Sequence, residues 1–561
     1  MKTKSALQLF PCLIFLFLTF SISAQTALRA PEREKTFDAQ HYIIRSTFNR
    51  SEKIYYGDTT VQVKPLKDGF STLILDAVGL KFDSVTLEPE GAKLEPKQDG
   101  ERLIVSLGKT FSANDVVSVR FKYSAKPKKG VYFVDSETLD GKLAHSSQVW
   151  TQGEAEESRH WFPSYDFPDD KATTEQYLTV LKDEVAISNG ELLETIENAD
   201  ATKTFHYKMP VPHSVYLTSF IIGKYVKVES KYKDTPLGFY VYPGKEDIVE
   251  KAYGKTVDMM RVFEELTGVN FPYNKYDQTT VARFNFGGME NITATTMADS
   301  EIHFAAFDFG REAVMDLVSH ELAHSWFGNL VTTKDWSNLW LNEGFATFME
   351  AAYREKLKGR SDYLRKVKED ADRFMAEDSF SGSRHPLFRL NAPTDDSLFD
   401  TTTYQKGGAV IHTLREEIGD EAFWKAINIY LNRHKFANVE TPDLKQAMEE
   451  ASGQNLDWFF KQWVYQAGFP KLTVRQSYSP ARKRLTLTIT QTQKIDSITP
   501  SAFILPMDVE IKTAKGTKTE KIKIDKRTQV ITIPTDGKPT KLTFDKDAKI
   551  PIKMLKVTMA K

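Results

Sequence analysis

The sequence predicts an α+β protein of three domains, in which two β domains flank a helix-rich domain. Strand patterns fill residues 25–228, helical periods dominate residues 229–468, and strand patterns return in residues 469–561. A His-Glu-x-x-His segment, His320 to His324, lies inside the helix-rich region. We expect domain boundaries close to residues 228 and 468.

The first 24 residues have the features of a secretory signal peptide. Two lysines precede an apolar run over residues 7–20, which is too short to cross a bilayer, and cleavage is expected after Ala24. No later stretch is long and apolar enough to span a membrane. Because the only cysteine, Cys12, lies in this segment, the mature chain has no disulfide. We expect an exported protein, periplasmic or secreted.

Strand signals on both sides of the helical region alternate with period two. In the lysine-rich stretch 512–527, Lys521-Ile522-Lys523-Ile524 indicates the solvent face of a strand. Without the two signal-peptide lysines the formal charge changes from -1 to -3, so neither nucleic acid nor an anionic membrane is an evident partner. The clearest strands are 60–63, 73–75, 102–105, 117–123 and 484–489.

The spacing of His320 and His324 predicts a metal site. Histidines at positions i and i+4 of a helix share one face, so both imidazoles can reach a metal at about 2.0–2.1 Å. An apolar stripe through residues 314–322 supports the helix, and Gly328-Asn329 mark its expected end.

A second helix is expected from about Asn342 to Lys358, stopped by Gly359, with Glu343 in its first turn. The intervening loop can fold this helix back, so that Glu343 completes a set of two histidines and one carboxylate. Three protein ligands leave a fourth position for water, as in catalytic zinc sites. Asp335 and Asn342 are expected either to orient these ligands or to act as helix caps.

Glu321 is offset by about 100° from His320 around the helix, so it does not readily bind the same metal. It is placed to take a proton from the water and to deliver it to the leaving amine.

Together with the Gly287-Gly288-Met289-Glu290-Asn291 segment and Asn342-Glu343-Gly344-Phe345-Ala346, this motif resembles the zinc aminopeptidases of the aminopeptidase N family. These are gluzincin metallopeptidases with eighteen residues between the second histidine and the ligand glutamate. Further matches cover nearly the whole mature chain in the family's order: Thr151-Gln152-Gly153-Glu154, Trp161-Phe162-Pro163, Asp166-Phe167-Pro168, Phe399-Asp400 and Tyr404-Gln405-Lys406-Gly407.

The resemblance implies a saddle-shaped amino-terminal β domain, a thermolysin-like catalytic domain and a carboxyl-terminal β sandwich. It implies one Zn²⁺ per chain and gives Tyr404 the role of stabilising the oxyanion of amide hydrolysis. Glu290 and Glu154 match the carboxylates that bind the free amino terminus of a peptide, so that one residue is removed per cycle.

Other residues of these motifs are expected to contact the substrate. Gly287 and Gly288 let backbone approach backbone, and residues 280–284 before them are expected to form a strand edge to which a peptide adds. By resemblance, an apolar pocket for the first residue favours large neutral or basic side chains. The full set of substrate-binding residues is Gln152, Glu154, Phe286, Gly287, Gly288, Met289, Glu290 and Asn291.

Many members of that family continue with a large helical domain over the active site, whereas this chain stops at Lys561. A more open cleft is expected, unless another subunit covers it. Two alternatives stay open. One is an epoxide hydrolase like the leukotriene hydrolase branch of the family. Glu154 argues against it, since that branch has glutamine at the corresponding position. The other is a noncatalytic peptide-binding protein on the same fold.

Overall fold

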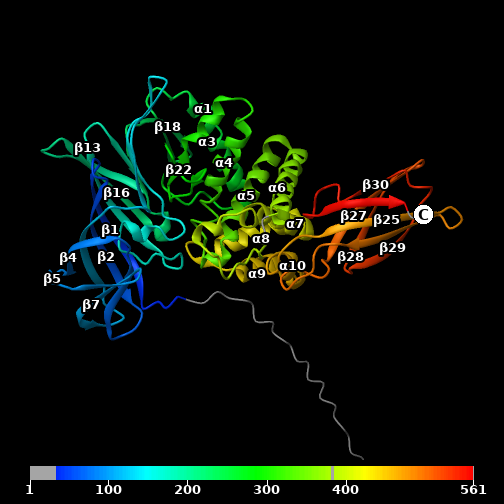
Figure 1. The fold of residues 1–561 in the computed structure, drawn as a ribbon, viewed down its shortest axis with the longest axis horizontal. Coiled ribbons are helices and arrows are strands. Elements are labelled where there is room, and N and C mark those ends of the chain that lie inside the picture. The colour runs from blue at the N-terminus through cyan, green and yellow to red at the C-terminus, as the bar shows by residue number, and fades with distance from the viewer. Residues whose placement is uncertain (1–32, 381–383, 560–561) are drawn as a thin grey trace, which may run out of the picture.

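The computed structural model describes residues 33–380 and 384–559, which form three parts along the longest axis of the molecule (Figure 1). A β-rich part, a helix-rich part and a second β-rich part follow one another, which confirms the predicted fold class. The predicted signal peptide, residues 1–24, lies outside the described residues. Within the described ranges, no helix has both the length and the apolar character of a membrane span.

The amino-terminal part is built on an eight-stranded sheet with a second, four-stranded sheet beside it. Val117 to Tyr123 shows why these segments form strands: its valines and aromatic residues are buried at every second position. In order across the large sheet, the strands are β15 (Glu191–Glu197), β16 (Thr202–His213), β13 (Ala172–Leu181), β1 (Phe37–Asn49), β2 (Ile54–Pro65), β8 (Val117–Ala125), β4 (Leu80–Glu88) and β5 (Ala92–Lys93). The four-stranded sheet contains β14 (Val185–Ser188), β17 (Phe220–Gly223), β12 (Gln148–Thr151) and β9 (Val131–Val134).

Smaller elements complete this part. A three-stranded sheet contains β3 (Phe70–Asp76), β7 (Arg102–Phe111) and β6 (Pro96–Asp99), and a hairpin contains β10 (Glu137–Leu139) and β11 (Lys142–His145).

The central part has a five-stranded sheet covered by helices. Its strands, in order, are β18 (Val226–Tyr232), β19 (Thr235–Val241), β20 (Tyr276–Val281), β22 (Ala294–Ala298) and β21 (Gly288–Met289). The predicted boundary at residue 228 therefore falls inside β18. The helices are α1 (Ile248–Tyr253), α2 (Thr256–Thr267), α3 (Asp299–Ile302), α4 (Arg311–Ala323), α5 (Trp340–Lys358), α6 (Arg360–Phe380), α7 (Gly407–Ile418), α8 (Asp420–Arg433), α9 (Thr441–Ser452) and α10 (Asp457–Trp463).

The carboxyl-terminal part is a sandwich of two sheets. One has the order β29 (Thr528–Pro534), β26 (Arg484–Gln491), β25 (Lys471–Ser479), β31 (Lys553–Met559), and the other β28 (Gly516–Ile524), β27 (Leu505–Thr513), β30 (Lys541–Phe544). Buried residues of both sheets, such as Leu487 and Val509, belong to the same apolar cluster as the helices of the central part. This continuous core connects the sandwich firmly to the central part.

Candidate metal centre

Two crossing helices bring the predicted ligands together. His320 lies in the last turn of α4, His324 caps its carboxyl end, and Glu343 lies in the first turn of α5. The helix ends at Ala323, earlier than the expected Gly328-Asn329, because the chain turns at once and His324 Nδ1 donates to the Phe327 carbonyl at 2.9 Å. This bond leaves His324 Nε2 free to face Glu343.

The three ligand groups have a spacing that suits one tetrahedral ion. His320 Nε2 and His324 Nε2 lie 3.1 and 3.4 Å from the same carboxylate oxygen of Glu343. Ligand atoms about 2.0–2.1 Å from a tetrahedral zinc ion lie about 3.3 Å apart, so the residues fit such an ion. All three side chains are buried and belong to one group that could hold a metal.

The charges around the histidines also favour a cation. Burial lowers the pKa of His324, but the charges of Glu290 and Glu343 outweigh it and raise this pKa to about 9. Burial acts the same way on His320, where hydrogen bonds to Glu343 and Glu350 raise the pKa well above its usual range. The site thus holds positive charge between carboxylates, and a metal ion can replace these protons when it binds.

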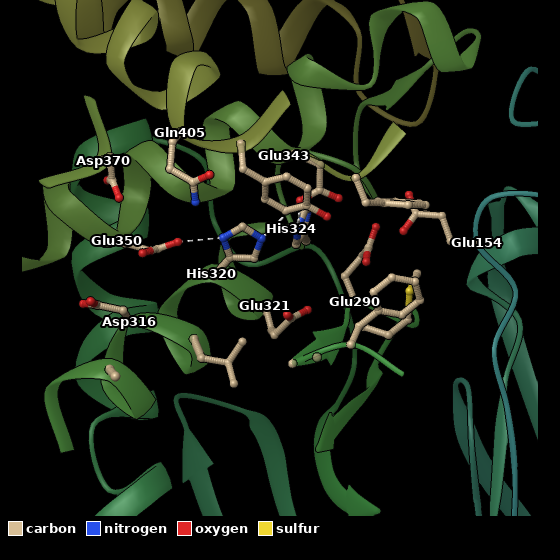
Figure 2. Close-up of a pocket in the computed structure, with 18 of the residues that line it drawn as sticks. Glu154, Glu290, Asp316, His320, Glu321, His324, Glu343, Glu350, Asp370 and Gln405 are labelled. Atoms are coloured by element: carbon tan, nitrogen blue, oxygen red, sulfur yellow. Dashed lines mark hydrogen bonds and ion pairs between the residues drawn. The ribbon is translucent and has the colours of Figure 1, made fainter. Parts of the chain in front are cut away.

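Glu321 points into the same cavity without joining the three ligands (Figure 2). One ligand atom of Glu321 lies within 4.8 Å of one on Glu290 and one on His324. Burial raises the pKa of Glu321 to about 8, although the nearby histidines oppose the shift. A carboxyl group whose pKa lies near neutrality can both accept and return a proton.

Tyr404 lies on a π-helical turn, η6 (Thr402–Lys406), just before α7. Its ring stacks on the imidazole of His320, with centroids 5.8 Å apart and planes at 17°. Two glycines allow this turn to approach α5 closely. A Cβ at Gly407 would lie 2.8 Å from the Cα of Gly344, the residue after the predicted ligand Glu343. Burial, and then the charge of Glu343, raise the pKa of Tyr404 well above its usual range, so the hydroxyl keeps its proton and can donate it.

Glu154 and Glu290 form an anionic wall of the cavity. Figure 2 shows both carboxylates directed toward Glu343 from the side opposite Glu350. Glu154, Glu290 and Glu343 offer ligand atoms within 4.8 Å of one another. Oε1 of Glu154 and Oε1 of Glu290 are buried without a hydrogen-bond partner among the described residues. Burial and the charge of Glu290 raise the pKa of Glu154 well above its usual range, so a cation bound here would relieve the repulsion.

The glycine-rich segment lies along the cavity, but not on the strand predicted to be the edge. β20, which includes residues 280–281, is fully buried between β19 and β22, whereas β21 (Gly288–Met289) is the edge strand. The expectation of an edge at residues 280–284 is therefore wrong. A Cβ at Gly288 would lie 2.3 Å from Oε1 of Glu321, which shows how closely this edge approaches the expected base.

Most of the expected substrate-binding residues line the cavity, and two do not. Glu154 and the consecutive residues Phe286, Gly287, Gly288, Met289 and Glu290 line it, together with Phe399. Gln152 lies behind this wall, where its amide donates to the Glu154 carbonyl and the Met289 sulfur. Asn291 is turned toward β22 and donates to Thr296. Neither Gln152 nor Asn291 lines the cavity, and their contact with a substrate stays a prediction.

The residues at the other end of the cavity, on α5 and α6, were not predicted from the sequence. Glu350 accepts a hydrogen bond from His320 Nδ1 at 2.8 Å, and its second oxygen pairs with Lys366 at 2.8 Å. Lys366 also pairs with Asp370 on α6. Glu350 lies seven positions after Glu343, which places both on one face of α5, and this spacing was the available signal.

Arg373 follows on α6 and also lines the cavity. No carboxylate of the described residues forms an ion pair with it. The α6 end of the cavity therefore offers the unpaired guanidinium of Arg373, whereas the opposite end offers the carboxylates of Glu154 and Glu290.

The two residues expected either to orient the ligands or to cap helices have local roles. Asp335 caps a short 3₁₀ turn by accepting from the Ser337 amide at 2.8 Å. Asn342 accepts from the Thr333 amide at 3.2 Å. These contacts hold the loop between α4 and α5 and do not involve the ligand side chains.

Comparisons with known proteins agree with this geometry. The profile of the Peptidase family M1 domain matches residues 251–463, and that of the Peptidase M1 N-terminal domain matches residues 38–217. The chain is 27% identical to Aminopeptidase 2 of Candida albicans over 83% of this chain and 52% of that protein. It is 34% identical to Aminopeptidase N of Streptomyces lividans over 57% of this chain and 38% of that protein. It is 32% identical to Glutamyl aminopeptidase of Rattus norvegicus over 62% of this chain and 38% of that protein. The chain thus spans about half the length, or less, of these relatives.

Proposed function

Because the chain belongs to peptidase family M1, we propose that it is a zinc-dependent aminopeptidase that removes single residues from the amino terminus of peptides. One observation carries this proposal. A single cavity contains three metal-ligating groups, a separate carboxyl group beside them, and two buried carboxylates with unpartnered oxygens. Its volume of about 520 Å³ suits a short peptide segment.

His320, His324 and Glu343 would hold the zinc ion, which when bound supplies Lewis-acid character and lowers the pKa of water toward neutrality. Glu321 takes a proton from the attacking water and transfers it to the leaving amine. Burial, which raises the pKa of Glu321, favours holding the proton between these two transfers. The Tyr404 hydroxyl donates a hydrogen bond to the oxyanion that develops on the scissile carbonyl.

Glu154 and Glu290 bind the substrate's ammonium group. A cation between two buried carboxylates makes charge-assisted hydrogen bonds with the oxygens that lack protein partners. The ammonium group is thereby fixed next to the metal ligands, so the first peptide bond is the one within reach of Glu321. The edge strand β21 offers backbone groups with which the peptide can pair.

We further propose that the protein acts outside the cytoplasm, in the periplasm or as a secreted enzyme, on peptides that arise there. The signal-peptide pattern of residues 1–24 supports this. Amino-terminal sequencing of the protein from its native host should begin near Gln25. An intact Met1 would refute export by this signal.

A panel of fluorogenic aminoacyl amides tests the activity, each with a free and an acetylated amine. We expect turnover of the free amines only, together with one equivalent of zinc by elemental analysis. Glu321→Gln is the matched control, because it should retain zinc and lose turnover. Equal hydrolysis of acetylated and free substrates would exclude an aminopeptidase. Tight zinc binding without turnover of any amide would favour the noncatalytic peptide-binding alternative.

A further inference from the structure

Charge is distributed very unevenly along this chain. Residues 469–561 contain 20 lysines and arginines against 8 aspartates and glutamates, whereas residues 1–468 contain 55 against 68. The formal net charge of -1 therefore conceals a strongly basic sandwich joined to an acidic remainder. Figure 1 places the sandwich at one end of the long axis, so the two charges are separated along the molecule.

Most of the sandwich cations have no ion-pair partner. Of the nineteen lysines and arginines in residues 469–559, only Lys518, Lys546 and Lys549 form an ion pair with a described carboxylate. Unpaired charges of one sign sum to a field that attracts polyanions.

Five of these unpaired cations lie on the outer face of the β29-β26-β25-β31 sheet, which we call the basic face: Lys471, Arg475, Arg484, Lys553 and Lys556. The pairing register defines it: Arg475 lies opposite Thr488 and Thr558, and Lys556 lies opposite Thr473. No aspartate or glutamate occupies an outward position on this sheet. The basic face comprises Lys471, Thr473, Arg475, Ser477, Ser479, Arg484, Thr486, Thr488, Thr490, Thr528, Val530, Thr532, Pro534, Lys553, Lys556 and Thr558.

The opposite sheet of the sandwich differs. Its outward positions include Asp508 and Glu510 on the middle strand β27, and Glu510 pairs with Lys546. Lysines such as Lys521 and Lys523 lie beside these carboxylates. The opposite sheet thus has four outward lysines and two outward carboxylates, whereas the basic face has five cations and no carboxylate.

Exposed apolar residues accompany the cations. Val530 on the basic face is 62% exposed, and Leu555, at the bulge of β31, is 48% exposed. Cations mixed with exposed apolar side chains suit the boundary between lipid headgroups and acyl chains. The outward positions contain no aromatic residue on which a nucleic-acid base could stack.

We propose that the basic face docks onto an anionic phospholipid surface. Its lysines and arginines pair with lipid phosphates, its hydroxyls donate to the same oxygens, and Val530 and Leu555 enter the headgroup boundary. The acidic remainder is repelled by the same surface.

Vesicle sedimentation with the full mature chain tests this. We expect binding to vesicles of phosphatidylcholine and phosphatidylglycerol in equal parts, and none to phosphatidylcholine alone. Raising the salt from about 0.1 M to about 1 M shortens the Debye length from about 10 Å to about 3 Å and should release the protein. Absence of binding to the anionic vesicles would refute the proposal. Equal binding to both vesicle types would also refute it.

Two matched triple variants separate the basic face from overall charge. Arg475→Glu/Arg484→Glu/Lys556→Glu reverses three charges on the basic face, and Lys521→Glu/Lys523→Glu/Lys541→Glu reverses three on the opposite sheet. Each cation near an anionic surface contributes about fivefold to partitioning, so the first variant should bind at least about 100-fold more weakly than wild type. The second should stay within a few-fold of wild type.

Both variants should retain wild-type turnover of a small aminoacyl amide, which shows that they are folded. Equal loss of vesicle binding in both variants would overturn the assignment to the basic face. Self-association at low salt that only the first variant abolishes, without vesicle binding, would instead identify the acidic part of a second copy as the partner.

Discussion

Removing the carboxylate of Glu350 should weaken zinc binding without unfolding the protein. Glu350 Oε1 accepts a hydrogen bond from His320 Nδ1 at 2.8 Å, and this bond fixes the imidazole ring so that Nε2 faces Glu343. Partners of this kind contribute about 10- to 100-fold to metal affinity, or about 1.4–2.7 kcal/mol. Lys366 keeps Asp370 as a partner at 2.8 Å, so Glu350→Ala does not leave a buried ammonium unpaired.

Zinc affinity would be measured by competition with a chelating dye, on metal-free protein shown to be folded by circular dichroism. We expect Glu350→Ala to raise the Kd by 10- to 100-fold and Glu350→Gln, which keeps an acceptor oxygen, to raise it less. Activity should return toward wild type as zinc is added in excess. Glu369→Gln is the control, because Glu369 lies on the exposed side of α6 and, among the described residues, pairs only with Arg365. A Kd for Glu350→Ala within twofold of wild type would refute the reasoning.

Four further outcomes are expected. Glu321→Gln should lower kcat by about 10²- to 10⁴-fold with zinc content unchanged, as measured by steady-state kinetics and elemental analysis; loss of the metal would assign Glu321 a ligand role instead. Glu290→Gln removes a charge-assisted contact of about 1.5–3 kcal/mol, so kcat/KM for free-amine substrates should fall by about 10- to 150-fold, and unchanged kinetics would contradict the ammonium site. Arg373→Ala should raise KM for tripeptides with a free carboxylate and leave small aminoacyl amides unaffected, since only the longer substrates extend to α6. Burial lowers the pKa of His412 to about 3, so below pH 6.5 only the unfolded chain takes up a proton at this residue, and folding stability falls with pH. In denaturant titrations, His412→Gln should therefore make the loss of stability between pH 8 and pH 5 smaller by about 2 kcal/mol. An unchanged dependence of stability on pH would refute this.

Local patterns predicted much of the metal centre. The spacing of four residues is enough to place His320 and His324 on one face, and Gly359 ends α5 as the sequence indicates. Alternating residues also identified strands in both β-rich parts. In each case the decisive interactions are between residues close in sequence, so the pattern contains the information.

The features that were missed depend on contacts between distant segments. Glu350 meets His320 only because α4 and α5 cross. Its spacing from Glu343 indicates a shared face of α5 but does not indicate the contact with His320. Residues 280–284 have the composition of an edge strand, but pairing with β19 and β22 buries β20 in the sheet. The early end of α4 is set by a bond between His324 and a carbonyl in the following turn.

The contact between Gly344 and Gly407 has a consequence for how the enzyme can move. With a Cβ absent on both sides, the backbones of α5 and the Tyr404 turn meet without an intervening side chain. Because no side chain separates the two backbones at this contact, we expect Glu343 and Tyr404 to move together. We therefore expect the cavity to open at its opposite wall, where strand β21 and the segment of Glu154 carry the two carboxylates proposed to bind the substrate's ammonium group.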